Sequence, residues 1–143
     1  MNLSPHFTLE EMVISETASR KGINNTPSAA VIENMRVLCG VLEEVRRLLG
    51  QPILITSGYR SAALNKAIGG STTSAHQHGL AADFIAPPLT PLEVCLQIEA
   101  SDIGFDQLIY EYTWTHFGLR KENMRRQTLT LNKAGGYIQG IKG

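Results

Sequence analysis

The longest regular pattern in the chain is an apolar stripe between residues 31 and 49. Apolar side chains recur there at spacings of three and four residues: Val31, Met35, Leu38, Leu42, Val45 and Leu49. This period places them on one face of an α-helix. Thr26 and Pro27 precede the stripe as a candidate N-cap and first helical residue, and Gly50 follows it as a candidate C-cap. We therefore predict a long amphipathic helix that begins at Pro27 and ends at Gly50.

Two shorter helices carry their own start signals. Thr8 and Glu11 have the spacing of a capping box, which predicts a short helix over residues 7–12. Thr90 and Pro91 repeat the cap and first-position signal, and predict a helix that runs to about Ala100. A further brief helix is expected over residues 61–67.

Runs rich in β-branched and aromatic residues predict the strands, which cover residues 52–56, 80–85, 107–110, 115–119 and 126–131. The runs 107–110 and 115–119 are close enough to form a hairpin. Helices come first and strands mixed with helices follow. This order predicts an α+β fold with a mainly antiparallel sheet and helices packed on one side. The length of 143 residues and the absence of an internal linker predict a single domain over residues 1–143.

The amino-acid composition limits the classes of protein to which the chain can belong. Hydrophobic residues make up 43% and charged residues 18%, which favours a packed core over disorder. The formal net charge of +0 gives no reason to expect a nucleic-acid or membrane partner, and we expect a monomer. The N-terminus has no basic region followed by an apolar run, so we expect no signal peptide. Cys39 and Cys95 lie in apolar helical patterns, which predicts buried free thiols.

The candidate chemistry lies in two histidines and an aspartate. His76 and Asp83 are seven residues apart, so an extended chain would separate them unless it bends between them. Gly79 can supply the bend and leave space near a bound ion. His116 would arrive from a different strand. Two imidazoles and one carboxylate, with a fourth position open, suit a catalytic zinc ion.

Around these residues the chain resembles the M15 family of zinc peptidases, a group of D-Ala-D-Ala carboxypeptidases and peptidoglycan endopeptidases. The Ser-Gly-Tyr-Arg-Ser run at 57–61 and the Trp-Thr-His run at 114–116 match the family in kind and order. The resemblance covers roughly residues 7–127 and is closest to the phage-associated branch, which opens with a similar Phe-Thr-Leu-x-Glu helix. The family pattern Ser-x-His-x-x-Gly-x-Ala-x-Asp is matched at every fixed position, by Ser74, His76, Gly79, Ala81 and Asp83.

The resemblance implies a hedgehog/DD-peptidase-like fold and one Zn²⁺ ion held by His76, Asp83 and His116. It further implies hydrolysis of peptide bonds in peptidoglycan stem peptides, by a carboxypeptidase or an endopeptidase of a phage lysis system. Such a protein would be made in the cytoplasm of an infected host and would reach the cell wall after release or as a virion component. His78 is the competing ligand, and the family pattern favours His76. His78 would then line the cleft or contact substrate.

Amide hydrolysis also needs a group that transfers a proton, and Glu111 is the predicted general base. Many family members carry Asp or Glu three residues before the last ligand, where this chain has Thr113. The alternative for Glu111 is a surface position in a hairpin turn. Arg60 can bind a carboxylate or a developing oxyanion, and is predicted to be catalytic and substrate-binding. Its alternative is a surface ion pair.

Ser74 and Tyr59 are further expected substrate contacts, although Ser74 could instead hold the loop. Trp114 fits a cleft rim and a core position equally well. No Gly-x-Ser-x-Gly elbow is present, which argues against a serine nucleophile. Two other functions remain open at this stage: a non-catalytic zinc domain of the same fold, which Thr113 favours, and a phage structural protein. The sequence also leaves open which peptidoglycan bond is cut.

Overall fold

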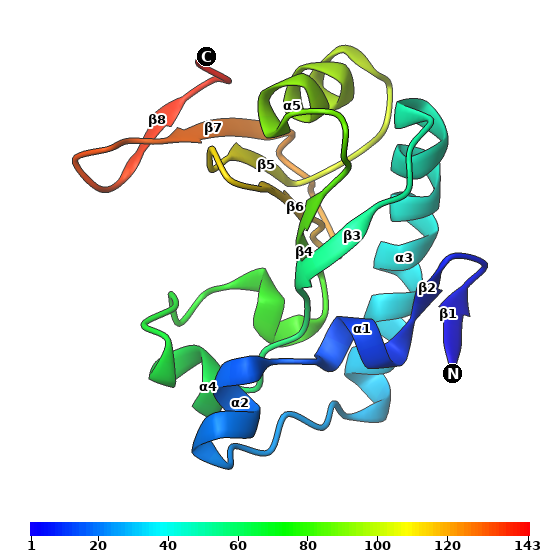
Figure 1. Cartoon of the computed structure of the whole chain (residues 1–143), viewed down its shortest axis with the longest axis vertical. Coiled ribbons are helices and arrows are strands. Elements are labelled where there is room, and N and C mark those ends of the chain that lie inside the picture. The colour runs from blue at the N-terminus through cyan, green and yellow to red at the C-terminus, as the bar shows by residue number, and fades with distance from the viewer.

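A six-stranded sheet forms the centre of the computed structural model, which describes residues 1–143 (Figure 1). Every neighbouring pair of strands is antiparallel except β5 and β7, which run parallel. This confirms the predicted mainly antiparallel sheet. In spatial order the strands are β3 (Leu54–Ser57), β4 (Ala81–Ile85), β6 (Thr115–Gly118), β5 (Gln107–Tyr110), β7 (Gln127–Leu131) and β8 (Tyr137–Gln139).

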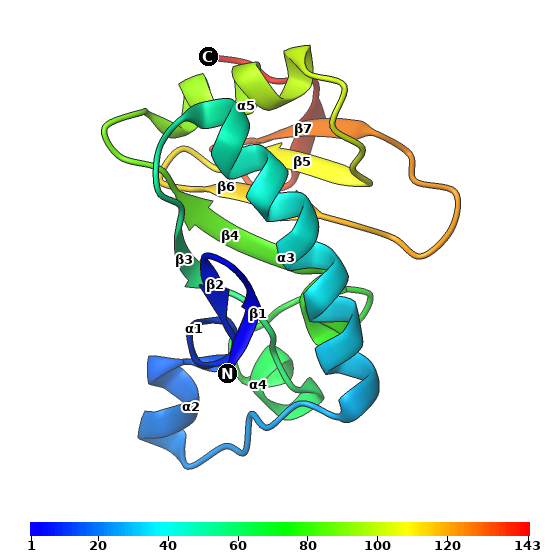
Figure 2. The ribbon, with the colours of Figure 1, turned by 90° about the vertical axis from the view of Figure 1, so that its right-hand side faces the viewer.

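Two helices, α3 (Ala29–Leu49) and α5 (Pro91–Ala100), pack on one face of the sheet (Figures 1 and 2). This confirms the α+β prediction with helices on one side. None of the helices combines the length and the apolar character that crossing a bilayer requires. The remaining elements are β1 (Asn2–Ser4), β2 (Phe7–Thr8), α1 (Leu9–Val13), α2 (Glu16–Lys21), α4 (Ala62–Ala67) and the 3₁₀ helix η1 (Ala75–His78).

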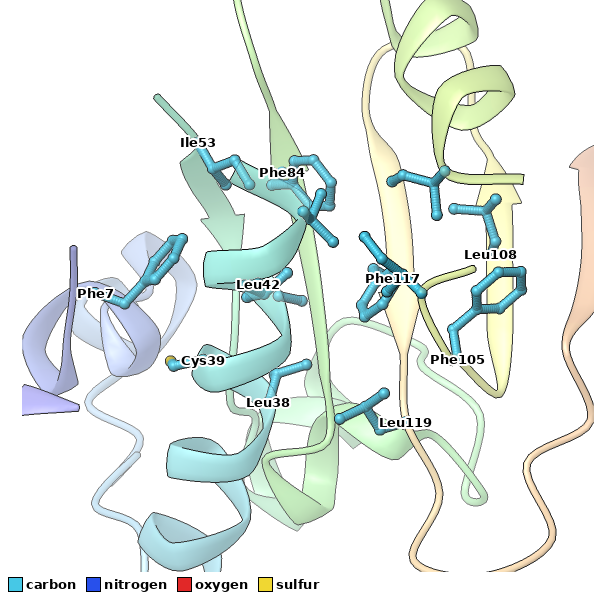
Figure 3. Packing of buried hydrophobic residues seen from close by; sticks show 14 of the residues in the cluster. Phe7, Leu38, Cys39, Leu42, Ile53, Phe84, Phe105, Leu108, Phe117 and Leu119 are labelled. Carbon is cyan, nitrogen blue, oxygen red and sulfur yellow. The ribbon is translucent and has the colours of Figure 1, made fainter. Parts of the chain in front are cut away.

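The core lies between the sheet and the two helices. Strand register pairs Ala82 with Phe117 and Leu108 with Phe117, so these side chains share the face that meets α3 and α5. Phe84 lies on the same face two positions along β4 and is fully buried. Figure 3 shows these rings packed towards Leu38 and Leu42 of α3. The alternate positions of the same strands therefore point to the opposite face, away from α3 and α5.

Both cysteines belong to this core. Cys39 on α3 and Cys95 on α5 are buried and unpaired, which confirms the predicted free thiols. Burial raises the pKa of Cys39 to about 12 and that of Cys95 to about 11. The thiolate is the reactive form, so both thiols are inert at neutral pH.

Several predicted boundaries shift. The predicted start of the long helix at Pro27 is wrong, because Ser28 adopts extended backbone angles and its Oγ accepts a hydrogen bond from the Val31 backbone N–H. The helix consequently begins at Ala29. The capping box of Thr8 and Glu11 is confirmed, but Phe7 and Thr8 pair with β1 before the helix begins. The sequence did not predict β1, α2, η1 or β8, each of which has only three to six residues.

Gly79 bends the chain between His76 and Asp83, as predicted, but it does so against α3. It ends η1 with φ 70°, and a Cβ at this position would lie 2.9 Å from the Val31 carbonyl oxygen and 2.7 Å from Met35 Cγ. The expectation that Gly79 leaves space at the metal is therefore wrong. A glycine is needed here because the backbone is left-handed and α3 packs directly against it.

We expect Gly79→Ala to lower the free energy of unfolding by about 2–4 kcal/mol, from left-handed strain and overpacking together. Gly50→Ala is the matched control, because Gly50 also caps a helix with φ 66° but has nothing within 4 Å of an added Cβ. That control should lose only about 1 kcal/mol, from backbone strain alone. Urea denaturation of both variants measures the difference, and equal losses would refute the packing argument.

Candidate metal centre

Three side chains converge on the face of the sheet that the helices leave open. Asp83 and His116 are paired across β4 and β6, so both point to this face, and His76 reaches it from η1. Asp83 Oδ1 lies 3.4 Å from His76 Nε2 and 3.0 Å from His116 Nδ1. One donor atom from each residue lies within 4.8 Å of the other two, and all three residues are buried. The structure thus brings together the three residues that the sequence nominated as ligands.

The spacing of these donor atoms fits a single metal ion. Two donors bound at about 2.0–2.1 Å in tetrahedral geometry lie about 3.3 Å apart. The observed distances of 3.4 Å and 3.0 Å from Asp83 Oδ1 to the two imidazoles are close to that value. Buried carboxylates are normally paired with a cation or bound to a metal. The group His76, Asp83 and His116 could therefore hold a metal ion.

The orientation of His76 is determined by its neighbours. The Ser74 Oγ accepts a hydrogen bond from the His76 backbone N–H, and His76 Nδ1 lies 2.7 Å from the carbonyl oxygen of Gly58. A carbonyl can only accept, so Nδ1 carries the hydrogen and Nε2 is left with a free lone pair towards Asp83. Burial lowers the pKa of His76, against the opposing effect of Asp83. His76 is therefore neutral at pH 7, which is the form that binds metal.

The Ser-Gly-Tyr-Arg-Ser run at residues 57–61 holds His76 in position through backbone contacts. The backbone N–H of Arg60 donates to the carbonyl oxygen of His76 at 3.0 Å. Gly58, whose carbonyl binds the imidazole, packs directly against the backbone of Met12, where a Cβ would collide with the Met12 carbonyl. The glycine thus allows α1 to approach closely and lets the turn position His76.

The second carboxylate oxygen of Asp83 forms an ion pair with Arg60. Asp83 Oδ2 lies 3.6 Å from Arg60 Nη2, and Arg60 Nη1 donates to Asn65 Oδ1 at 3.4 Å. Burial alone would raise the pKa of Asp83, but the hydrogen bond with His116 and the nearby His76 imidazole hold it well below its ordinary value. Asp83 is therefore ionised at neutral pH. The side chain of Arg60 is only 16% exposed and lines the cleft, so the surface ion pair considered for it is not what the structure shows.

Glu111 follows β5 in the hairpin turn and faces the cleft. Its Oε2 accepts a hydrogen bond from Trp114 Nε1 at 3.1 Å, and its backbone N–H donates to the Trp114 carbonyl. Burial raises the pKa of Glu111 and the charge of Asp83 raises it further, against smaller opposing effects of His116, Trp114 and Arg60. Glu111 is thus half-buried and close enough to Asp83 and His116 for their charges to change its pKa.

These residues line one cleft with a volume of about 720 Å³. Its floor is the open face of the sheet, including Asp83, His116 and Ile109. The segment 69–78 forms one wall, and the hairpin of β7 and β8 contributes the other (Figure 1). A cleft of this size is large enough for several residues of a peptide.

The structure places the other nominated residues as follows. Ser74 and His78 line the cleft, and Ser74 also holds the loop through its bond to the His76 backbone. Trp114 lines the cleft as well. Tyr59 does not: it packs against the hydrophobic core and lines a separate, smaller pocket.

Arg120 and Tyr137 are among the cleft residues that were not predicted from the sequence. Arg120 lines the cleft two positions beyond Gly118, and strand alternation from His116 could have identified it. Tyr137 lines the cleft from β8. It follows Gly135 and Gly136, whose positive φ values form the turn before that strand. The two glycines were a turn signal that could have predicted a final hairpin.

The comparison with known families agrees with this geometry. A family model described as Peptidase M15 matches residues 5–118, which include all three candidate ligands, Arg60 and Glu111. No curated protein matches the chain. The matched residues make up most of the chain and indicate that it is a peptidase. The chain therefore belongs to the Peptidase M15 family.

Proposed function

We propose that the protein is a zinc-dependent peptidase that hydrolyses peptide bonds in the stem peptides of bacterial peptidoglycan. The observation that carries the proposal is the buried group of His76, Asp83 and His116 at the floor of a cleft that also contains Glu111. Two imidazoles and a carboxylate are a donor set that zinc accepts in catalytic sites.

In this proposal His76, Asp83 and His116 hold the ion. When bound, zinc would lower the pKa of a coordinated water to about 7 and would polarise a carbonyl group. Glu111 accepts a proton from the attacking water and passes it to the leaving amine. Its raised pKa suits this role, because a carboxylate whose pKa lies closer to the working pH is a stronger base than an ordinary glutamate and can still return the proton. The indole N–H of Trp114 holds one oxygen of Glu111 in place.

Two arginines that line the cleft could bind the carboxylates of a substrate. Arg60 lines the cleft beside Asp83, and Arg120 lines it without an ion pair of its own. Stem peptides carry free carboxylates, which arginine binds strongly. We propose that Arg60 stabilises the developing oxyanion or a substrate carboxylate, and that Ser74 and His78 contact the peptide. Nothing in the structure brings Tyr59 into this contact.

The resemblance to the phage-associated branch supports a more specific proposal, a phage lysis enzyme. Peptidoglycan lies outside the cytoplasmic membrane, so such an enzyme would act after release from the host cytoplasm or as a part of the virion. The open choice between carboxypeptidase and endopeptidase concerns only how far the peptide extends past the metal site.

Digestion of purified peptidoglycan tests the proposed function directly. We expect the zinc-loaded protein to release new amino groups, and mass analysis of the muropeptides to show one cleaved bond: D-Ala-D-Ala, L-Ala-D-Glu or the D-Ala crosslink. A chelator should stop the release and added zinc should restore it. A protein that retains zinc but cleaves none of these bonds would instead be the non-catalytic zinc domain of the same fold.

A further inference from the structure

The hairpin of β7 and β8 lines the cleft and lies outside the residues that the family model matches. The match ends at residue 118, and the hairpin begins at Gln127. In Figure 1 the hairpin extends from the edge of the sheet on the same side as the segment around η1. Both segments line the cleft, so the hairpin adds a wall to the candidate metal centre.

Strand register directs Tyr137 into this cleft. Leu129 pairs with Ile109 of β5, and both line the cleft, so alternate residues of β7 face it too. Leu131 is one such residue, and it pairs with Tyr137 across β7 and β8. Continuing the pairing of β5 and β7 by one residue places Glu111 beside Leu131. Glu111 and Tyr137 therefore lie two strands apart, about 10 Å between backbones, with both side chains over the cleft.

The phenol of Tyr137 lies within reach of the site's charges and has no partner of its own. Burial, and then the negative charges of Glu111 and Asp83, raise the pKa of Tyr137, while Arg60 opposes them. The hydroxyl therefore keeps its proton at neutral pH and can donate a hydrogen bond. No hydrogen bond to the side chain is present, and the residue is 52% exposed. Tyr137 thus offers a free hydrogen-bond donor at the wall of the cleft.

We propose that Tyr137 is a substrate-binding residue whose phenol O–H donates a hydrogen bond to a carbonyl oxygen of the peptide bound in the cleft. The inference rests on the proposed function in one respect, that the occupant is a peptide. An extended peptide offers carbonyl oxygens along its length, and Tyr137 would bind one of them across the cleft from the segment 69–78. The ring would form an apolar wall over the same stretch of peptide.

Steady-state kinetics of Tyr137→Phe test this contact, since the variant keeps the ring and loses only the hydroxyl. A hydrogen bond that is equally strong in the bound substrate and in the transition state affects KM and leaves kcat unchanged. We expect KM for a stem peptide to rise about three- to tenfold, with kcat within about twofold of the unmodified protein. Tyr112→Phe is the matched control, because Tyr112 is an exposed tyrosine in the β5–β6 turn that does not line the cleft. Its KM should not change.

A binding measurement separates this inference from the proposed function. Trp114 is the only tryptophan of the chain and lines the cleft, so its fluorescence reports occupancy. We would titrate the slow variant Glu111→Gln with the pentapeptide L-Ala-D-Glu-diaminopimelate-D-Ala-D-Ala, with and without Tyr137→Phe. We expect Kd to rise about three- to tenfold with Tyr137→Phe and to stay constant with Tyr112→Phe.

Each outcome has a distinct meaning. If the zinc-loaded protein binds the pentapeptide but releases no amino groups from purified peptidoglycan, the proposed function is refuted, while the effect of Tyr137→Phe on Kd would still support the inference. Cleavage with an unchanged KM and Kd in Tyr137→Phe would refute the inference alone. A Tyr137→Phe variant with lower kcat but unchanged KM and Kd would also refute it, because the phenol would then act on the reaction and not on binding.

Discussion

Replacing His76 or Asp83 with alanine is expected to abolish metal binding and peptidoglycan hydrolysis together. Each change removes one of only three donor groups, which lie within 4.8 Å of one another. Loss of a group that merely supports a metal ligand already costs 10–100-fold in affinity, so loss of a ligand should cost more than about 100-fold. Zinc content after dialysis at neutral pH measures the first effect, and muropeptide release measures the second.

His78→Ala is the control for this prediction. His78 stands two residues from His76 and is the competing ligand in the sequence, but it lies outside the group of converging donors. Its side chain is exposed at the cleft, so its loss should leave the zinc content unchanged. A His78→Ala protein without zinc, beside a His76→Ala protein that keeps it, would reverse the assignment. Circular dichroism of each variant checks that the fold survives.

Glu111→Gln should keep the metal and lose turnover by about 10²- to 10⁴-fold, the range that general acid–base catalysis contributes. The amide can still accept the hydrogen bond from Trp114, so the hairpin keeps its shape while the side chain can no longer take a proton. Zinc content and kcat/KM, measured on the same preparation, separate these effects. Glu122→Gln is the control, because Glu122 is exposed and does not line the cleft.

The pH profile adds a second readout for Glu111. A general base acts when it is deprotonated, so kcat/KM should fall as the pH drops through the pKa of Glu111. Burial and the charge of Asp83 raise that pKa, which moves the fall to a higher pH than an ordinary glutamate would give. Glu111→Gln should lack this acidic limb. Full activity of Glu111→Gln would show that another group transfers the proton, in keeping with the absence of an acidic residue at Thr113.

The candidate site shows where sequence reasoning succeeds. His76, Asp83 and His116 could be nominated together because their types and order match a family pattern, and the fold brings their donor atoms together. Arg60 was nominated too, but its ion pair with Asp83 Oδ2 was not foreseen. That contact depends on how the turn after β3 packs against β4. The spacing of residues in the sequence does not predict this packing. Tyr59, the residue before it, points away from the cleft for the same reason.

The amino-acid sequence by itself determined the helices with strong periodicity and caps, the main strands, the α+β class and the buried thiols. These features depend on interactions within a few residues, or on apolar burial that a periodic pattern already shows. Only the tertiary structure decided that Gly79 packs against α3, that the Gly58 carbonyl orients His76 and that Tyr137 lines the cleft. Each of these depends on register and packing between segments far apart in the chain, where a shift of one residue would turn the side chain to the other face.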